Sequence, residues 1–477
     1  MEEMSGKNSG TVPENENETK TRVYKRGASK LRTEISKELR VERIMQQISQ
    51  EELAARVGTS KSGISRIESG NQNLTADSIS YLAEALNKQA VFMLKDKGIE
   101  YGNETLYQLK LYDEELMRFK LKRDLGTTAE IVSVNEERKH LLPLDMVLDD
   151  EGVVRWLQHR MIPNNRKFVA SILDSLGLTI HDTKGFVDIS MALSLNDSYW
   201  VTPVKFDGTF DEYNLYENRF TEVLSLIAYT GGKYSTNDFR TSPELTTNGM
   251  LRKAWKFSSS KGIWLYKGGT EGFANTGNEP YSEFYASQIA EKMRLHAVKY
   301  ELENWKGILA SKCKLFTDKD TSYIPIGRIV RTGGIKACIE FYKELGDDFY
   351  QELASMLVFD AIILNEDRHF GNFGLMRDNR TGEIISPAPI FDNGISLLCY
   401  AMKSDIKDIN EYIKTRSNPY HLGYISLARE VMGPVQKAQV RKLINFTFEE
   451  SDLCNLPTWR LRALEGVIQE RVQELLK

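Results

Sequence analysis

The sequence is poor in the residues and runs that mark several common classes of protein. Its 477 residues include four cysteines and six histidines. The cysteines stand far apart in the sequence and form no C-x-x-C pair: Cys313, Cys338, Cys399 and Cys454. This spacing excludes the usual zinc motifs and a disulfide framework, and it predicts reduced thiols. The richest apolar run, residues 356–364, contains Asp360 and is too short to cross a bilayer, and the opening MEEMSGKNSG lacks the apolar core of a signal peptide. We therefore expect a cytoplasmic protein without a membrane partner.

An excess of charge of one sign is also missing. Lysine and arginine number 63 against 67 aspartates and glutamates, and the net charge of −4 argues against a protein that coats nucleic acid or membrane along its length. The charge is unevenly distributed. Residues 1–19 carry five Glu, one Lys and almost no apolar side chain, which predicts a disordered tail. Residues 20–66 carry twelve Lys and Arg against five Glu, although such a run alone is also typical of a solvated helix face.

The basic stretch contains the pattern of three short helices. Ser49, Ser60 and Thr75 each precede a run with apolar side chains at helical spacing, and each has a hydroxyl that can cap a first helical turn. Gly58 and Gly70 follow the first two runs and favour helix termination. Two helices joined by a short turn that contains Gly form a helix-turn-helix unit, whose second helix can enter the major groove of DNA.

The string SQEELAARVGTSKSGISRIESG, at residues 49–70, resembles the lambda-repressor-like (XRE) helix-turn-helix family. The resemblance implies that Gln50 braces phosphate and the recognition side chains, and that Lys61, Ser62 and Arg66 meet base edges or phosphates. The implied partner is operator DNA, with an inverted repeat if the protein forms a homodimer. The alternative is a degenerate motif that serves only for protein contacts.

Two strands and a small polar turn are expected in the middle of the chain. Residues 250–257 and 262–267 favour strands around the turn Ser-Ser-Ser-Lys. The preceding segment, TSPELTTNGM at residues 241–250, is a turn of the kind whose backbone N–H groups can cover phosphates. We therefore place Gly249, which lies in this turn, at a nucleotide-binding site.

Lys267 ends the second expected strand, where it either points inward or, as a strand-end lysine, reaches solvent. A Gly-rich loop follows, and then an expected helix over residues 281–293 with Glu283 near its start. A strand lysine followed by a helix with an inward glutamate is the ion pair by which protein kinases hold nucleotide phosphates. Glu279, in the loop before the helix, is an alternative partner for the lysine.

The sharpest signal follows a strongly apolar expected helix. The loop NEDRHFGNFG places Asp367 and Asn372 five residues apart, which is the D-x-x-x-x-N spacing of a kinase catalytic loop. The aspartate there accepts the proton of an attacking hydroxyl, and the asparagine coordinates a metal ion that bridges phosphates. After an expected hairpin, Asp392 ends an apolar strand, where a second metal-binding carboxylate is needed. We interpret Arg368 and His369 as residues that brace the loop.

The strings NEDRHFGNFG and FDNG, with Lys267 and NEPYSEFYASQIAEKM upstream, resemble the HipA-like serine/threonine kinase family. The resemblance covers roughly the C-terminal half of the chain. It implies that Asp367 is the catalytic base, that Asn372 and Asp392 are magnesium ligands, and that Lys267 with Glu283 holds the phosphates of ATP.

Two further family properties depend on this resemblance. Members carry a serine in the phosphate-binding turn whose autophosphorylation inactivates the enzyme, and Ser242, Thr246 and Thr247 are the candidates here. In toxin–antitoxin pairs of this family, the kinase and the DNA-binding protein are commonly separate chains, whereas both signals occur here in one chain.

Together these patterns predict a multidomain protein, with an all-α helix-turn-helix domain followed by an α+β, two-lobed kinase-like body with a helical C-lobe. The expected order is a tail (1–19), the helix-turn-helix domain (20–93), an intermediate region (94–229), the kinase N-lobe (230–310) and the C-lobe (311–477). We expect a serine/threonine protein kinase that uses ATP and Mg²⁺ and regulates its own transcription. The alternatives are a DNA-binding regulator whose kinase-like domain binds nucleotide without turnover, and a kinase of small molecules.

Overall fold

The computed structural model describes residues 32–477 except 34, 45, 47, 89, 91–103, 124–125, 233–240, 259 and 273–274. The tail expected over residues 1–19 lies outside the described residues. The chain divides into two compact units, Met1–Lys97 and Gly98–Lys477, called below the first unit and the second unit.

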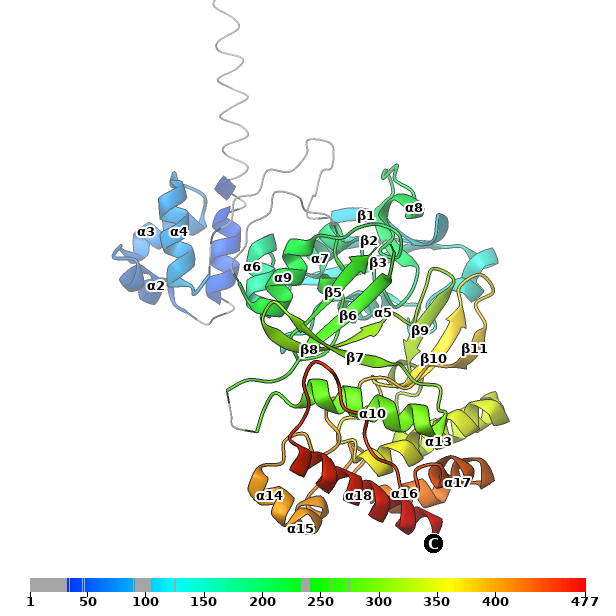
Figure 1. The fold of residues 1–477 in the computed structure, drawn as a ribbon. Helices are drawn as coiled ribbons and strands as arrows, with labels where there is room; N and C mark the ends of the chain where they lie inside the picture. Colours follow the sequence, from blue (N-terminus) through cyan, green and yellow to red (C-terminus); the bar gives the residue numbers. More distant parts are fainter. Residues whose placement is uncertain are drawn as a thin grey trace, which may run out of the picture. The chain divides into compact units, whose positions relative to one another are not determined.

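The first unit is helical (Figure 1). Its helices are residues 35–44, α2 (Gln50–Arg56), α3 (Lys61–Glu68) and α4 (Ala76–Ala85). Ser49, Ser60 and Thr75 cap α2, α3 and α4, because each hydroxyl accepts a backbone N–H of the first turn, as the sequence predicted. Buried apolar side chains form one core: Leu39, Ile48, Leu53, Ile64, Leu82 and Leu86.

The second unit begins with an antiparallel sheet in the order β3-β2-β1-β4. Its strands are β1 (Glu104–Leu111), β2 (Glu114–Arg123), β3 (Thr127–Val134) and β4 (Tyr199–Pro203). The helices of this part are η1 (Glu136–Leu141), α5 (Asp150–Gln158), α6 (Val169–Leu176), α7 (Thr183–Ser190), α8 (Phe210–Tyr213) and α9 (Glu222–Thr230). The sequence did not predict the first three strands, because their apolar and polar residues do not alternate regularly.

A second antiparallel sheet has the order β5-β6-β8-β7 and contacts helix α10. Its elements are η2 (Pro243–Leu245), β5 (Lys253–Ser258), β6 (Gly262–Gly268), α10 (Glu279–Met293), β7 (Tyr300–Trp305) and β8 (Ile308–Lys314). The two expected strands are confirmed as β5 and β6, and Lys267 on β6 lies opposite Lys253 on β5. The boundary expected between residues 310 and 311 falls inside β8, so this sheet continues to Lys314.

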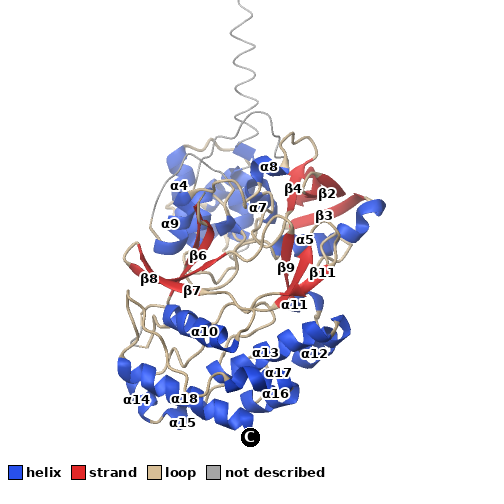
Figure 2. Cartoon of the chain, turned by 45° about the vertical axis from the view of Figure 1, so that its right-hand side comes forward, coloured by secondary structure: helices blue, strands red, loops and turns tan. Residues whose placement is uncertain are grey.

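The remaining strands form a three-stranded antiparallel sheet in the order β11-β10-β9. They are β9 (Thr321–Pro325), β10 (Gly374–Asp378) and β11 (Ile384–Pro387). The helices are α11 (Ile326–Ile329), α12 (Gly334–Leu345), α13 (Asp347–Ile363), α14 (Lys403–Lys407), α15 (Ile409–Lys414), α16 (Tyr424–Val431), α17 (Pro434–Arg441) and α18 (Thr458–Leu476). Figure 2 shows α10, α13 and α16–α18 gathered below the strands of the second unit.

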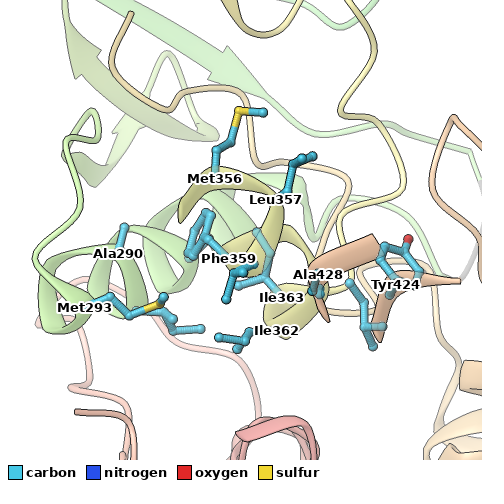
Figure 3. Close-up of a cluster of buried hydrophobic side chains, with 14 of the residues drawn as sticks. Ala290, Met293, Met356, Leu357, Phe359, Ile362, Ile363, Tyr424 and Ala428 are labelled. Atoms are coloured by element: carbon cyan, nitrogen blue, oxygen red, sulfur yellow. The ribbon is translucent and has the colours of Figure 1, made fainter. Parts of the chain in front are cut away.

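The largest apolar core surrounds α13. In Figure 3, side chains of α13 meet those of α10 and α16, which contribute Met293 and Tyr424. Every residue from Leu353 to Ile363 is buried. A helix that is buried on all sides has apolar residues on every face rather than in one stripe, and this segment shows that pattern except at Ser355 and Asp360.

The expected fold class is confirmed. An all-α helix-turn-helix unit precedes an α+β unit with antiparallel sheets, and the sheet with α10 and the helical C-terminal part form its two lobes. Among the described residues, no helix combines the length and the apolar character that a membrane span requires.

The α13 core allows a direct test of the packing. Ile362→Ala, at a fully buried position, should lower the free energy of unfolding by about 2–5 kcal/mol, because apolar burial is lost and a cavity remains. Ile385→Ala, at a position that is 48% exposed on β11, should change it by about 0.5 kcal/mol or less. Urea unfolding of the full chain, followed by tryptophan fluorescence, measures the difference. All six tryptophans belong to the second unit: Trp156, Trp200, Trp255, Trp264, Trp305 and Trp459. Equal shifts for both variants would contradict this core.

Candidate active site and nucleic-acid interface

The amine of Lys267 lies between two carboxylates from different elements. Lys267, on β6, is 5% exposed, and its Nζ donates to Glu283 on α10 and, at 2.5 Å, to Oδ1 of Asp392. The other oxygen of Glu283 accepts the backbone N–H of Asn393 at 2.8 Å. A buried ammonium group needs such partners, because it has lost its contacts with water. The amine therefore joins β6, α10 and the segment after β11 into one site.

Glu279 has a different role from the alternative considered above. It is the first residue of α10, which begins two residues before the expected position, and it is buried. Its Oε1 accepts the N–H of Thr270 at 3.2 Å and the hydroxyls of Thr270 and Tyr400 at 2.6 and 2.9 Å. Glu279 thus attaches the Gly-rich loop to the segment around Tyr400, and the helix partner of Lys267 is Glu283.

A buried arginine braces the loop after α13. Arg368 is fully buried and pairs with Asp360 on α13, through Nε at 3.0 Å and Nη2 at 3.1 Å. Its Nη1 donates to the carbonyl oxygens of Asn372 and Phe391, and its Nη2 donates to Oδ1 of Asn393. One guanidinium group therefore connects α13, the loop and the segment after β11, as the bracing role expected for Arg368 requires.

The loop holds Asp367 and Asn372 in a fixed relation. Oδ1 of Asn365 accepts the N–H of Asp367 at 3.0 Å, and Nδ2 of Asn372 donates to the carbonyl oxygen of Asp367 at 2.9 Å. Because the nitrogen of the Asn372 amide is engaged inside the loop, its Oδ1 is the atom that can bind a cation. His369 supports the turn, since its Nδ1 accepts the N–H of Gly371 at 3.0 Å.

Asp392 has an unusual backbone conformation. Its φ is 57°, in the left-handed region that glycine favours and that aspartate tolerates better than most residues. The expectation that it ends a regular strand was wrong, because β11 ends at Pro387 and Ile390 forms only an isolated bridge with Ala297. The N–H of Asp392 donates to the hydroxyl of Tyr300 at 3.1 Å. Such a conformation persists where neighbouring contacts hold it, and it is common at functional sites.

The charges in this site shift its pKa values in opposite directions. Burial raises the pKa of Asp367, His369 opposes this shift, and the negative charge of Asp392 adds to it. Burial also opposes the ionisation of Asp392, but the positive charges of Lys267 and Lys253 outweigh burial and hold its pKa below the ordinary value. Asp392 is therefore a persistent anion that can bind a cation, whereas Asp367 has an increased affinity for a proton.

The first residue of β5, Lys253, is a lysine of this site that the sequence interpretation missed. The buried Lys253 lies opposite Lys267 across the two strands, and its Nζ donates to the carbonyl oxygen of Asn248 at 2.8 Å. Gly249 has a φ of 97°, and a Cβ atom there would lie 2.1 Å from Nζ of Lys253. Burial lowers the pKa of Lys253 to about 8, while Asp392 opposes this shift. The positive φ therefore favours glycine at position 249, and the absence of a side chain leaves room for the buried amine. The lysine in the strand sequence LRKAWKF, at the position paired with Lys267, was the available signal.

The three candidate hydroxyls of this turn make internal contacts. Ser242 and Thr246 are buried. Ser242 accepts the N–H of Glu244, Thr246 donates to the carbonyl oxygen of Leu193, and Thr247 donates to a backbone carbonyl of the turn. Phosphorylation of Ser242 or Thr246 would therefore require the turn to open.

The candidate cation ligands fit magnesium bound together with phosphates. In the part of the chain that the structure describes, no three His, Cys, Asp or Glu side chains form a group that could hold a metal ion. Mg²⁺ is usually bound through one or two carboxylates, with waters and substrate phosphates as the other ligands. The Asp392 side chain, which is 30% exposed, and Oδ1 of Asn372 are oxygen donors of this kind.

In the first unit, α3 exposes the three residues that were predicted to meet DNA. Lys61, Ser62 and Arg66 are exposed, whereas Gly63 is buried. A Cβ atom at Gly63 would lie 2.8 Å from Oγ1 of Thr59. Gly63 therefore serves the close packing of α3 on the preceding turn, and the exposed face of the helix remains polar and basic.

Gln50 braces α3 from within the first unit. Its Nε2 donates to Oε2 of Glu68 at 2.7 Å, and the buried Glu68 pairs with Arg43 at 2.6 Å. Burial opposes the ionisation of Glu68, but its hydrogen bonds with Arg43 and Gln50 outweigh burial and lower its pKa. This network ties α2 and the helix over residues 35–44 to the last turn of α3.

Two solved structures resemble the chain at low sequence identity. One is the proinflammatory kinase CtkA of Helicobacter pylori, which is 17% identical with a TM-score of 0.35, over 47% of this chain and 91% of that chain. The other is the toxin–antitoxin system HipA, HipB and its operator DNA complex of Shewanella oneidensis MR-1, which is 13% identical with a TM-score of 0.46, over 78% of this chain and 99% of that chain. No curated protein matches the sequence significantly. The helix-turn-helix family model matches residues 37–92, so this part of the chain is a helix-turn-helix domain.

Proposed function

We propose that the second unit is a serine/threonine protein kinase that uses ATP and Mg²⁺, and that the first unit binds operator DNA and regulates transcription. The observation that carries the kinase proposal is the buried amine of Lys267, which Glu283 and Asp392 share. Burial alone would lower the pKa of Lys267, but Asp392 and Glu283 raise it, so the group stays cationic. A fixed cation of this kind holds nucleotide phosphates in kinases.

Each residue of the site has a distinct role in phosphoryl transfer. Lys267 and Lys253 hold the phosphates, while Asp392 and Oδ1 of Asn372 would hold Mg²⁺, which neutralises phosphate charge when it is bound. Asp367 accepts the proton of the attacking hydroxyl, and its raised pKa favours this step. Positioning and electrostatic stabilisation are most of what phosphoryl transfer requires from a protein.

Removal of the base should abolish most of the activity. Asp367→Asn, which keeps the shape of the side chain, should slow phosphate transfer about 10²- to 10⁴-fold. Binding of Mg·ATP should be retained, because Asp367 has no role in holding the phosphates. Incubation with radiolabelled ATP, with the protein itself and lysate proteins as acceptors, measures the transfer, and Asp452→Asn, at an exposed bend, is the control.

The outcome also separates the alternatives. Equal phosphate transfer by Asp367→Asn and the wild type would contradict the assignment of Asp367 as the base. If the wild type binds ATP but phosphorylates nothing, the chain is a DNA-binding regulator whose kinase-like unit binds nucleotide without turnover. If small-molecule acceptors are added to the same assay, transfer to them but to no protein would identify a small-molecule kinase.

The DNA proposal rests on the exposed face of α3. Lys61 and Arg66 supply positive charge there, and Ser62 supplies a hydrogen-bonding hydroxyl. Cationic side chains gain affinity by releasing counterions from phosphates, and polar groups at a helix surface can read base edges. If the protein forms a homodimer, two such helices would contact an inverted repeat with half-sites about one helical turn apart.

Loss of these cations should weaken DNA binding in a salt-dependent way. The double variant Lys61→Ala/Arg66→Ala should bind an operator fragment, selected with the wild type, more weakly. The slope of log K against log salt should fall by about one for each lost phosphate contact. Lys88→Ala, which removes a cation paired with Glu42, is the control. Fluorescence anisotropy measures the slopes. Unchanged binding by the double variant would show that α3 does not read the DNA.

A further inference from the structure

The part of the region between β3 and β5 that precedes residue 241, to which the sequence assigned no chemistry, holds the turn before β5. Arg166 lies between α5 and α6 and pairs with Glu244 at 2.6 Å. Both side chains are completely excluded from solvent, and the two residues are 78 positions apart in the sequence.

The guanidinium group of Arg166 contacts both ends of this turn. Its Nη1 donates to the carbonyl oxygens of Glu244 at 2.9 Å and Thr247 at 3.1 Å. Its Nη2 donates to the carbonyl oxygen of Lys253 at 2.9 Å, as well as to the Glu244 carboxylate. Only the planar fork of arginine can make such a set of bonds at once. The turn from Glu244 to Lys253, which contains Gly249, is therefore closed around one cation.

Glu244 is the second anchor of the turn. Its Oε1 accepts the N–H of Trp255 at 2.7 Å and the hydroxyl of Ser225 at 3.3 Å. Burial raises the pKa of Glu244, and the charge of Arg166 opposes this shift. Because Ser225 belongs to α9 and Trp255 to β5, the carboxylate connects the region between β3 and β5 to the sheet that carries Lys267.

Two additional contacts from the same region hold the middle of the turn. The N–H of Lys167 donates to the carbonyl oxygen of Met250 at 2.8 Å, and the hydroxyl of Thr246 donates to the carbonyl oxygen of Leu193 at 3.0 Å. A buried ion pair often adds little to stability, because the loss of hydration offsets the attraction of the charges. Directed hydrogen bonds to several carbonyl groups instead select one conformation of the turn.

We propose that Arg166 is a positioning residue for the phosphates of ATP. By holding both ends of the turn, Arg166 keeps Lys253 opposite Lys267 and keeps Gly249 beside the Lys253 amine. The amines of Lys253 and Lys267 can then bind the same polyphosphate group. The inference rests on the proposed kinase function. It adds the region between β3 and β5 to the machinery that binds the nucleotide.

The test compares Arg166→Met with Arg160→Met in the full chain. Arg160 is a matched control, because it is also buried, pairs with Asp197 at 2.6 Å and donates to the carbonyl oxygen of Ala192, but none of its hydrogen-bond partners lies in the turn. Calorimetry gives the Kd of Mg·ATP and of adenosine, which lacks phosphates. Arg166→Met should raise the Kd of Mg·ATP about 10- to 100-fold and leave that of adenosine unchanged. Arg160→Met should leave both unchanged.

A second measurement does not involve the nucleotide. The backbone amides of residues 244–255 should exchange hydrogen faster in Arg166→Met than in the wild type and in Arg160→Met. Arg166→Lys keeps the charge but loses the fork, so it should restore the affinity for Mg·ATP only in part. Glu244→Gln keeps the shape of the Glu244 side chain but removes its charge. It should raise the Kd of Mg·ATP by a smaller factor than Arg166→Met does, and it provides the test if Arg166→Met fails to fold.

Three results would overturn the inference. The first is an equal loss of affinity for adenosine and Mg·ATP, and the second is an equal effect of Arg166→Met and Arg160→Met, either of which would indicate a role in stability alone. The third is faster exchange in the turn with an unchanged Kd of Mg·ATP. A wild-type protein that binds neither compound would overturn the proposed kinase function itself, and this inference with it.

Discussion

The ammonium group of Lys267 is withdrawn from water, and a buried charge is tolerated only where opposite charges compensate it. That requirement brings Glu283 and Asp392 to the same amine, although one lies on α10 and the other follows β11. Glu283 uses its second oxygen to hold the N–H of Asn393, so the compensating group also fixes the backbone next to Asp392. The relative placement of β6, α10 and this segment therefore depends on one charge.

A second buried cation, Arg368, fixes the backbone on both sides of Asp392. Arg368 is anchored on α13 through Asp360, and it holds the carbonyl oxygen of Phe391 and the side chain of Asn393. The residues on both sides of Asp392 are thus bound to Arg368, while the carboxylate between them is bound to the other cation. Arg368 also binds the carbonyl oxygen of Asn372. The same side chain therefore positions both the loop after α13 and the segment that contains Asp392. A substrate bound between them would meet groups whose relative positions are already determined.

The sequence was informative where a feature depends on neighbouring residues. Ser49 and Ser60 cap helices by contacts within one turn, so both caps could be recognised from spacing alone. Asp367 and Asn372 were likewise placed in one loop from their spacing, although their hydrogen bond was not predicted. The sequence was uninformative where segments far apart in the chain meet. The pair of Arg166 with Glu244 joins residues 78 positions apart, and no local pattern specifies it. The same holds for β1–β3, whose stability comes from cross-strand packing rather than from a distinctive composition.

In the proposed function both units bind a polyanion, and the cations proposed for this role lie in opposite environments. Lys61 and Arg66 on α3 are exposed, so salt screens them, and their contribution to binding falls as ionic strength rises. Lys267 and Lys253 are buried, where screening is weak and the direction of each amine is set by hydrogen bonds. Exposed cations can follow an extended phosphate backbone, whereas buried ones accept only a group that fits between them. A net charge of −4 is therefore compatible with both proposed sites, because each depends on its local charge and on its access to water rather than on the sum over the chain.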